Sequence, residues 1–492
     1  MMEFDDRGDE RSPLLPPPPQ SQRAAARRAQ RAWQALAFLL SAALLTVLLW
    51  EMTPYAKGSE PTPASPAHVR RDPKYPFARF FATKTAYWDQ RDGAESNQEL
   101  LTAYENALLR EDLELRQSHV IVRHGIRFPT ADSIEEIEAL LATLKRFGSL
   151  APAWLRSYSL PYNASVESEL GAAGKQEMRD LGRRMVLANG HAEPVTYNAS
   201  KARVRHTHAT RTKKSAQAYV GEFFANPDDV EFVEFPKGHD PLLRFYDSCP
   251  RYQREVKENA SAIAQWRAFE RSQLLSAARD ALVLSLGFQN SSAAAAAITA
   301  KEVQAAFSAC AFDYALYGIT DQWCSLLSEA LIVSVDYLDD LRAFYELAGG
   351  YAINYEMAAV LLQDVVAGMR GRLNRTNNLH AIADFAHAET TLPLMTLLGY
   401  TDRSPLLATT TLAAIEAREF RASVFAPFGA NIEFRLFTRK SNDEQHFVQV
   451  LVNEQEREIP GCEDVYCDFA KVERLWKAHL EDIDFDLLCR LV

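Results

Sequence analysis

Two arginines and a histidine in one short stretch carry the clearest chemistry of this chain. Residues 123–129 read Arg-His-Gly-Ile-Arg-Phe-Pro, so Arg123 and Arg127 stand on either side of His124. Guanidinium groups present planar forks of N–H donors that match phosphate oxygens, and they stay charged at neutral pH. A neutral imidazole has one ring nitrogen free to attack phosphorus and to carry the phosphoryl group covalently. The stretch therefore predicts phosphoryl transfer, to which a protein contributes mainly positioning and charge neutralisation.

The neighbouring sequence predicts where this stretch lies. Residues 118–122 form a short, mostly apolar segment of the kind that fills a buried strand of a parallel sheet. His124 would then follow the carboxyl end of the strand, the edge at which open α/β sheets bind ligands. Gly125 lets the backbone approach a ligand closely. An ordinary basic turn with a surface histidine is the competing interpretation, but a pattern that fixes five residue types rarely arises by chance.

A second chemical stretch follows much later, at His387-Ala388-Glu389. Residues 379–386 predict a strand, and residues 390–393, Thr-Thr-Leu-Pro, predict a helix start. His387 and Glu389 would thus fall in a strand-to-helix turn, where alternate residues of an extended chain point the same way. An alkoxide is a poor leaving group, and a carboxyl group within reach can supply the proton that it needs.

Together the two stretches resemble the histidine acid phosphatases, branch 2 of a superfamily that includes the phytases. Residues 123–129 match the RHGxRxP signature, and the His-Ala-Glu form at 387–389 is similar to that of the multiple inositol polyphosphate phosphatases. The resemblance runs from about Tyr75 to the C-terminus. Further stretches that resemble this subfamily are residues 83–88, 170–178, 323–324, 349–354 and 448–454.

This resemblance implies an α/β fold with a phosphoglycerate-mutase-like core sheet flanked by helices and an inserted, mostly helical lobe. We expect the catalytic domain at residues 75–492, with the lobe mainly at 247–374. Apolar residues at three- and four-residue spacing predict helices at residues 134–147, 166–187, 261–286 and 292–307. Alternating apolar residues predict strands at 431–437 and 447–453, so that the chain returns to the sheet.

The resemblance also implies roles for individual residues. His124 is the nucleophile that forms a phosphohistidine, and Glu389 is the proton donor to the leaving group. Arg123, Arg127, Arg211 and His387 hold the phosphate, and no metal or cofactor is needed. The bound phosphate should favour the protonated carboxyl of Glu389 against the pull of the arginines, so we expect an acidic pH optimum.

The expected substrates are inositol polyphosphates, namely inositol hexakisphosphate and pentakisphosphate, and the resemblance extends to 2,3-bisphosphoglycerate. A broad-specificity histidine acid phosphatase is the alternative enzyme. A third hypothesis is an inactive phosphate-binding or adaptor membrane protein whose proline-rich tail recruits SH3-type partners. The complete signature together with Glu389 argues against the third hypothesis.

Residues 201–216 gather many positive charges, and three interpretations of them remain open. A charge run is most often a solvated helix face. His206 and His208 have the spacing of a metal pair, although no carboxylate or cysteine adjoins them. In the third interpretation Arg211 opens a helix whose N-terminus faces the phosphate. We favour this one, with outer phosphates of the substrate bound by Lys201, Arg203, Arg205, Lys213 and Lys214.

The composition limits the partners. The chain has 492 residues and a net charge of −11. Binding of DNA or RNA requires a broad basic surface, so the net charge argues against a nucleic-acid partner and for a small-molecule polyphosphate met by a local basic site. The sequence specifies no oligomeric state.

The N-terminal part predicts a type II membrane protein. Residues 1–31 read as a disordered cytoplasmic tail, in which Glu10 with Leu14 and Leu15 resembles an acidic dileucine signal of endolysosomal proteins, or is incidental. Residues 32–50 are almost wholly apolar and follow a cluster of arginines, which predicts a transmembrane signal anchor with the N-terminus in the cytoplasm. A cleaved signal peptide is the alternative. Residues 51–74 predict a proline-rich stalk.

Two features of the chain after residue 50 support a luminal or extracellular catalytic domain. All six cysteines follow the apolar segment, which favours disulfides in an oxidising compartment; Cys310–Cys324 and Cys462–Cys467 are plausible local pairs, and the first also fits the subfamily. A zinc site is the weaker interpretation because no Cys-x-x-Cys spacing occurs. No ER-retention tetrapeptide stands at residues 489–492. Five glycosylation acceptors also follow the segment: Asn163, Asn198, Asn259, Asn290 and Asn374.

Overall fold

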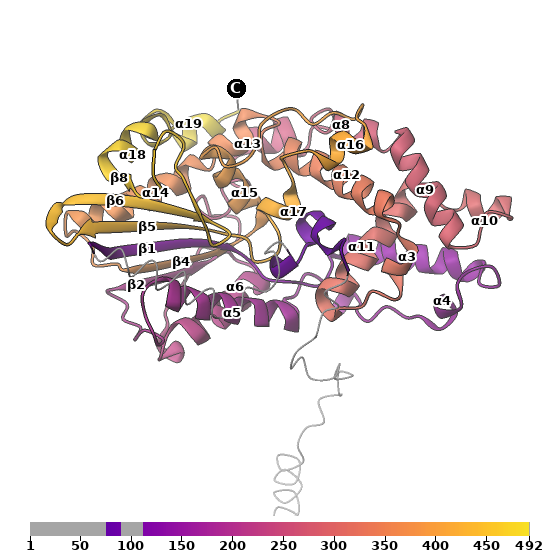
Figure 1. Ribbon diagram of the computed structural model, residues 1–492, viewed down its shortest axis with the longest axis horizontal. Helices are drawn as coiled ribbons and strands as arrows, with labels where there is room; N and C mark the ends of the chain where they lie inside the picture. The colour runs from indigo at the N-terminus through magenta and orange to yellow at the C-terminus, as the bar shows by residue number, and fades with distance from the viewer. Residues whose placement is uncertain (1–74, 90–111, 492) are drawn as a thin grey trace, which may run out of the picture. The chain divides into compact units, whose positions relative to one another are not determined.

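Strand β1 (Leu113–Arg123) lies at the centre of the sheet in the computed structural model of the chain, which describes residues 75–89 and 112–491 (Figure 1). It begins five residues before the predicted strand, and its last seven residues are buried. Strand β4 (Ala381–Ala386) pairs with it in parallel on one side, and β5 (Asn431–Arg439) pairs antiparallel on the other. The two segments with candidate chemistry therefore leave neighbouring strands at the same edge of the sheet.

The sheet is mixed, with the strand order β3-β2-β4-β1-β5-β6-β7, and β8 pairs with β6. The strands β3, β2, β4 and β1 are parallel, as expected for segments joined by helical crossovers. The strands from β5 to β7 pair antiparallel with their neighbours. The remaining strands are β2 (Ala202–His206), β3 (Phe232–Glu234), β6 (Asn442–Val452), β7 (Gln455–Arg457) and β8 (Cys467–Asp468).

Helices cover both faces of the sheet (Figure 1). Side chains alternate along β1, so Val120 and Val122 pack on one face and Ile121 on the other. The helices α5 (Ala172–Ala188) and α6 (Thr210–Phe223) cover the first face. The second face is covered by α14 (Ala359–Leu373), α15 (Ala388–Leu397) and α18 (Phe469–Leu475).

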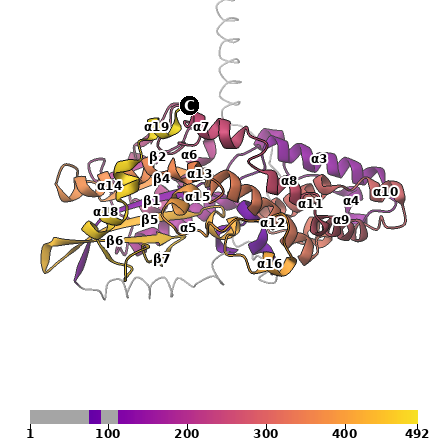
Figure 2. The ribbon, with the colours of Figure 1, turned by 90° about the horizontal axis from the view of Figure 1, so that it is seen from above.

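A separate helical lobe adjoins the sheet (Figures 1 and 2). Its core contains Trp323, Phe307 and Phe344, all nearly inaccessible to solvent. Its principal helices are α3 (Ala131–Arg146), α8 (Ala264–Phe269), α9 (Gln273–Ser285), α11 (Ala300–Tyr317) and α12 (Glu329–Leu347). Shorter helices are α4 (Ala153–Ser157), α7 (Pro250–Tyr252), α10 (Ser292–Ala296), α13 (Ala352–Glu356), α16 (Leu412–Glu416), α17 (Ala422–Phe425) and α19 (Phe485–Cys489).

The helices differ from the predicted ones where capping residues interrupt an apolar pattern. Residues 261–286 divide into α8 and α9 because the hydroxyl of Ser272 caps a new helix by accepting from the backbone N–H of Leu275. Residues 292–307 divide at Thr299, which begins α11 with a capping box. Helix α14, within the range predicted for the lobe, packs on the sheet, whereas α3 packs in the lobe.

Three disulfides join the described cysteines. Two are the local pairs expected from the sequence, Cys310–Cys324 and Cys462–Cys467. The third, Cys249–Cys489, connects residues 240 positions apart. Disulfides are typical of proteins that fold in oxidising compartments, so they support a luminal or secreted domain.

The predicted tail, signal anchor and stalk, residues 1–74, lie outside the described residues. Within residues 75–89 and 112–491, no helix has both the length and the apolar character needed to cross a membrane.

Candidate active site

The loop after β1 holds His124 in a fixed orientation. Its backbone N–H donates to the carbonyl of Ala386 at 3.0 Å, which ties the loop to the end of β4. The ring nitrogen Nδ1 lies 2.9 Å from the carbonyl oxygen of Gly125. Because a carbonyl can only accept, a neutral ring must carry its proton on Nδ1. The other nitrogen, Nε2, is then unprotonated and has a lone pair available for attack.

The surroundings of His124 favour the neutral ring. The side chain is almost completely buried, at 3% exposure. Burial lowers the pKa of His124 well below its usual value, and the charges of Arg123 and Arg211 lower it further. The ring of His387 lies edge-on to it, with the two centroids 5.6 Å apart. His124 therefore has the protonation state of a nucleophile at any pH near neutrality.

The backbone of helix α5 lies very close to the loop that follows β1. A Cβ atom at Gly125 would stand 2.6 Å from the carbonyl oxygen of Gly174, so only glycine fits at this contact. The buried carboxylate of Glu177 accepts hydrogen bonds from the backbone N–H groups of Ile126 and Tyr87, both at 3.0 Å. The Glu177 carboxylate thus holds the loop against the N-terminal segment 75–89.

Three arginines converge on His124, and we refer to Arg123, Arg127 and Arg211 as the arginine cluster. Burial and the charge of Arg127 lower the pKa of Arg123 to about 9, and burial with the charge of Arg211 lowers that of Arg127 to about 10. Both groups remain charged at neutral pH. The Nε–H groups of all three are buried and have no acceptor among the described residues. Buried, charged donors without an acceptor form a site for an anion.

His387 and Glu389 approach the arginine cluster from the start of α15. One Nη of Arg211 lies 3.2 Å from Nδ1 of His387 and donates to it, and Nε2 of the same ring lies 2.9 Å from the hydroxyl of Thr207. Burial and the charge of Arg211 lower the pKa of His387 well below its usual value. Burial lowers the pKa values of all three arginines, and the charge of the half-buried carboxylate of Glu389 opposes this shift in each, so Glu389 faces the same group of cations.

The structure adds Arg244 and Tyr246, which the sequence analysis missed. The charge of Glu389 acts on both side chains, and Arg244 in turn acts on His387 and Arg211. The hydroxyl of Thr390 donates to the carbonyl of Leu243 at 2.7 Å, which fixes their loop against α15. Both residues lie in an irregular turn without periodicity or motif, so no sequence signal distinguishes them from other loop residues.

A family model described as the histidine phosphatase superfamily (branch 2) matches residues 114–453 of this chain, from β1 through β6. The chain belongs to this superfamily. Multiple inositol polyphosphate phosphatase 1 of Gallus gallus is 28% identical over 394 residues, which cover 76% of this chain and 84% of the relative. The protein of the same name from Homo sapiens is 27% identical over 447 residues, which cover 84% of this chain and 89% of the relative.

Two solved structures share the fold of this chain. The phytase from D. castellii matches with a TM-score of 0.65 over 81% of this chain and 91% of its own, at 15% identity. The multiple inositol polyphosphate phosphatase of Bifidobacterium longum, in a complex with inositol hexasulfate, matches with a TM-score of 0.64 over 82% of this chain and 98% of its own, also at 15% identity. The predicted α/β histidine phosphatase fold is thus confirmed.

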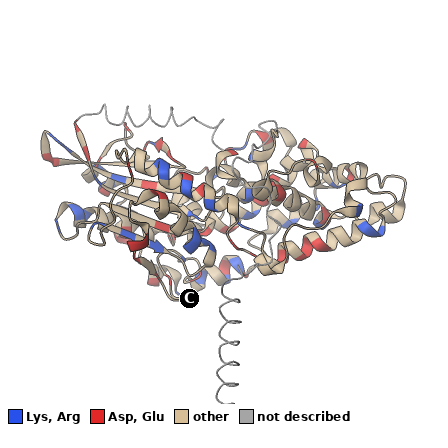
Figure 3. Ribbon diagram, turned by 90° about the horizontal axis from the view of Figure 1, so that it is seen from below, with Lys and Arg blue, Asp and Glu red and all other residues tan. Residues whose placement is uncertain are grey.

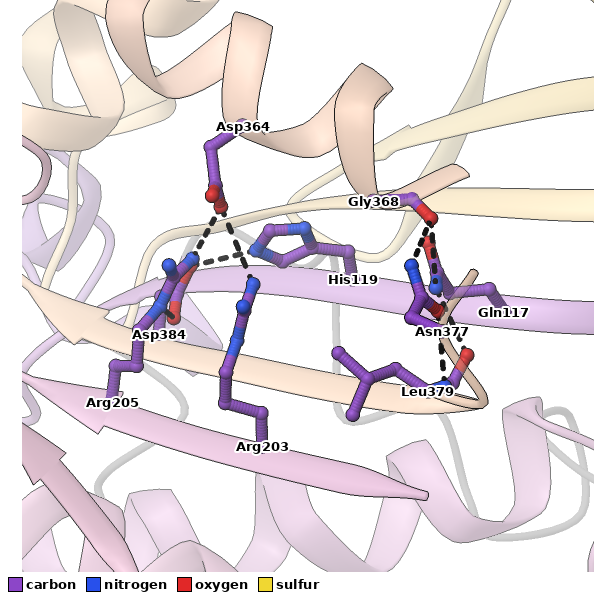
Figure 4. Close-up of polar contacts among 9 residues, drawn as sticks. All are labelled: Gln117, His119, Arg203, Arg205, Asp364, Gly368, Asn377, Leu379 and Asp384. Carbon is purple, nitrogen blue, oxygen red and sulfur yellow. Dashed lines mark hydrogen bonds and ion pairs between the residues drawn. The ribbon is translucent and has the colours of Figure 1, made fainter. Parts of the chain in front are cut away.

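Within this histidine phosphatase, Arg203 and Arg205 do not reach the arginine cluster. Both side chains point to the face of the sheet covered by α14 (Figure 4). Arg205 donates to both oxygens of Asp384 at 2.6 Å and to Asp364 at 2.8 Å, and Arg203 contacts Asp364 at 3.4 Å. Their donors are engaged by carboxylates, so the geometry does not support them as contacts for outer phosphates. We call Arg203, Arg205, Asp364, Asp384 and His119 the paired cluster.

The three lysines among the predicted outer-phosphate contacts lie in different places. Lys201 precedes β2 at the amino end of the strand, the edge opposite the arginine cluster. Lys213 is exposed in the first turns of α6, and Lys214 forms an ion pair with Glu169. The charge of Glu169 also acts on Arg211, so Lys214 lies toward the site. Lys213 and Lys214 therefore remain candidates, whereas the position of Lys201 argues against it.

The histidines at 206 and 208 both face a single carboxylate, that of Glu234. Among the residues that the structure describes, no group of three or more His, Cys, Asp or Glu side chains has the arrangement of a metal site. In the view of Figure 3, the positions of Lys and Arg and those of Asp and Glu are both spread over the described ribbon.

Proposed function

We propose that this histidine phosphatase hydrolyses phosphomonoesters of inositol polyphosphates through a phosphohistidine on His124. The observation that carries the proposal is a neutral, buried histidine whose free Nε2 lies among three arginines that form no ion pair with the described residues. Such a site binds an anion and presents a nucleophile to it.

In the first step, the lone pair of His124 Nε2 attacks phosphorus, and the bond between phosphorus and the ester oxygen breaks. Arg123, Arg127 and Arg211 neutralise the charge on the transferring group, with His387 beside them. Glu389 gives its proton to the leaving alkoxide. In the second step, Glu389 takes a proton from water, the resulting hydroxide attacks phosphorus, and the bond from phosphorus to Nε2 breaks to release inorganic phosphate.

The substrate assignment is supported by two independent facts. Relatives that align over most of this chain carry the name multiple inositol polyphosphate phosphatase 1. Further basic side chains come from the turn after β3 and from the first turns of α6, namely Arg244, Lys213 and Lys214, and they suit a ring with several phosphates. Arg244 and Lys214 each pair with one partly or fully exposed carboxylate, Asp247 and Glu169 respectively, unlike the buried pairing of Arg205. Inositol hexakisphosphate and pentakisphosphate are therefore the leading substrates, with 2,3-bisphosphoglycerate as a smaller one.

We also propose that residues 32–50 anchor the protein in a type II orientation, with the catalytic domain luminal or extracellular. The three disulfides and the five glycosylation acceptors support this orientation. Treatment with peptide N-glycosidase, followed by carbonate extraction of membranes, tests it. A protein that loses no mass and leaves the membrane on extraction would contradict it.

Phosphate release from inositol hexakisphosphate and from p-nitrophenyl phosphate tests the enzymatic proposal. The full chain is assayed between pH 4 and 8, with and without chelator, and His124→Ala is the control. We expect activity that resists chelation, is higher at acidic pH, prefers the inositol phosphate and disappears in the variant. Activity on the small ester alone would indicate a broad acid phosphatase, and activity on neither would indicate a phosphate-binding protein.

A further inference from the structure

The guanidinium group of Arg123 is held by two carbonyl groups from distant parts of the chain. One Nη donates to the carbonyl of Thr83 and to that of Ala426, both at 2.6 Å. The carbon Cζ lies 4.5 Å from the centroid of the Phe428 ring, which the guanidinium covers. Neither carbonyl belongs to a strand or to a long helix. The direction of Arg123 therefore depends on whatever fixes these two short segments.

A buried ionic cluster on helix α12 contacts both segments. Asp336 and Asp340 are fully buried and one turn apart, and Arg418 lies between them. Nε of Arg418 donates to Asp340 at 2.7 Å, and one Nη contacts Asp336. The second oxygen of Asp336 accepts a hydrogen bond from the backbone N–H of Ala82, and the second oxygen of Asp340 accepts one from the backbone N–H of Ala422, both at 2.8 Å. The cluster thus reaches the residue before Thr83 and the helix that ends just before Ala426.

The backbone at Ala82 is strained and needs such support. Its φ is +47°, in the left-handed region that costs a residue with a Cβ about 1–2 kcal/mol. A residue holds this conformation only where its surroundings enforce it. Asp336 binds the N–H of Ala82, and the neighbouring Asp339 binds Lys84 through an ion pair at 2.7 Å. The carbonyl of Thr83 lies between these two attachments.

Figure 1 shows segment 75–89, in indigo, beside α17 and α12. The segment also reaches the site directly, because the backbone N–H of Phe428 donates to the carbonyl of Thr85 at 2.9 Å. A shift of the ionic cluster would therefore move both carbonyls that hold Arg123. The C-terminal edge of the sheet, which holds His124 by its own backbone hydrogen bond to β4, would stay in place.

We propose that Asp336, Asp340 and Arg418 form a positioning cluster that orients Arg123 toward the transferring phosphate. These residues do not touch the substrate, and they act through the carbonyls of Thr83 and Ala426. The inference rests on the proposed function of the site. A purely structural cluster would stabilise the helical lobe without a specific effect on Arg123.

A double-mutant cycle distinguishes the two roles. Arg418→Lys keeps the charge but loses the planar fork, and Asp340→Asn is the second variant in case the first fails to fold. We expect either variant to lower kcat/KM by about 10- to 100-fold, to a similar extent for inositol hexakisphosphate and p-nitrophenyl phosphate. In an Arg123→Ala background the same substitution should lower kcat/KM by less than a further two-fold, because the guanidinium group that the cluster positions is already missing.

Glu346→Gln is the matched control. Glu346 is a buried acid on the same helix and pairs with Arg342 and Lys257, but it has no hydrogen bond to either segment that holds Arg123. We expect it to leave kcat/KM unchanged. An equal loss in this variant, or a full additional loss of activity in the Arg123→Ala background, would overturn the proposal.

Binding of inorganic phosphate provides a readout that does not depend on turnover. Phosphate should raise the melting temperature of the wild-type protein and of Glu346→Gln, and raise it markedly less in Arg418→Lys and Arg123→Ala. If the wild-type protein binds phosphate but hydrolyses no ester, the proposed function fails while the positioning cluster is still tested. An unchanged phosphate response in folded Arg418→Lys and Asp340→Asn would contradict the positioning role.

Discussion

Two groups of arginines in this protein differ in what neutralises them. In the paired cluster, Arg205 meets both oxygens of a fully buried aspartate, Asp384, which also receives a hydrogen bond of 2.7 Å from His119 (Figure 4). In the arginine cluster, no ion pair with a described residue is formed, and Glu389, the carboxylate whose charge acts on all three arginines, makes no hydrogen bond to described residues. Paired buried charges neutralise one another within the fold, whereas unpaired charges of one sign remain available for a ligand.

The two clusters also affect their carboxylates differently. Burial alone would raise the pKa of Asp384, but Arg205 and His119 hold it well below its usual value. Asp384 is therefore a permanent anion, suited to a structural ion pair. Glu389 stands at the first turn of a helix, half-buried and next to the place where a phosphate would bind. Asp384 is thus engaged within the fold, whereas no hydrogen bond to a described residue engages the carboxylate of Glu389.

The largest effect on activity is expected for substitution of Glu389, and it should differ in kind from the effect of substituting Asp384. Glu389→Gln should lower kcat for inositol hexakisphosphate by roughly 10²–10⁴-fold, because the alkoxide then leaves without a proton. The loss with p-nitrophenyl phosphate should be much smaller, since nitrophenolate leaves without protonation. Asp384→Asn should lower the urea midpoint and affect both substrates alike. Equal losses on both substrates for Glu389→Gln would show that another group is the donor.

The next largest effect concerns one arginine from each cluster. Arg127→Met should lower kcat/KM by about 10²–10³-fold while the free energy of unfolding stays nearly unchanged. Arg205→Met should have the opposite result, a loss of about 3–5 kcal/mol in the free energy of unfolding, because a buried carboxylate is left without its main partner. Urea titration and steady-state kinetics on both variants measure the two quantities. If both variants lost activity and stability together, the two clusters would not have these separate roles.

Arg244, which pairs with the exposed Asp247, tests how far the anion site extends beyond the arginine cluster. Arg244→Met should raise the KM for inositol hexakisphosphate about ten-fold, since one charge-assisted contact to an outer phosphate is lost. The KM for p-nitrophenyl phosphate, which has a single phosphate, should change less than two-fold. Arg251→Met is the control, because Arg251 pairs with Glu255 on the surface. A similar rise for both substrates would place Arg244 at the transferring phosphate instead.

Asp313 is a buried acid that has no cationic partner among the described residues. It is buried in the lobe, where burial raises its pKa to about 7, and the hydroxyl of Tyr158 donates to it at 2.9 Å. In the unfolded chain its pKa is near 3.8. Between these values the folded state retains the proton that the unfolded state has lost, so this contribution to stability is complete below pH 4 and disappears by pH 7.

The corresponding measurement is the free energy of unfolding of wild type and Asp313→Asn between pH 4 and 8. The stability of the wild type relative to the variant should fall by about 1.4 kcal/mol per pH unit within this window and level off on either side. A difference that is constant with pH would mean that Asp313 titrates normally in the folded protein.

The parts of the site that could be predicted from the sequence are those that neighbouring residues encode. Arg123, His124 and Arg127 share one loop, and the strand before it is recognisable from its apolar residues. The two clusters could not be told apart, because Asp384 lies 179 residues from Arg205 and no local pattern indicates the pair. The same holds for Arg244, whose loop joins the site through contacts with α15.

The fold was predictable to the same degree. Capped helices and alternating strands were located near their true positions, whereas the division of 261–286 depended on one serine, Ser272, that ends one apolar pattern and begins another. The partner of Cys249 could not be predicted, since six cysteines allow fifteen pairings and this one spans 240 residues.

The bond between Cys249 and Cys489 has a consequence for the order of events during biosynthesis. Cys249 lies three residues after Tyr246, so its disulfide fixes the end of the turn that holds Arg244 and Tyr246. At about 5–20 residues per second, a ribosome needs roughly 12–48 s to add the 240 residues between the two cysteines. Cys310 and Cys324 are synthesised during this interval, and either can form a non-native disulfide with the free thiol of Cys249. We therefore expect a nascent chain in the secretory pathway to acquire activity late and to depend on a disulfide isomerase to correct early mispairing.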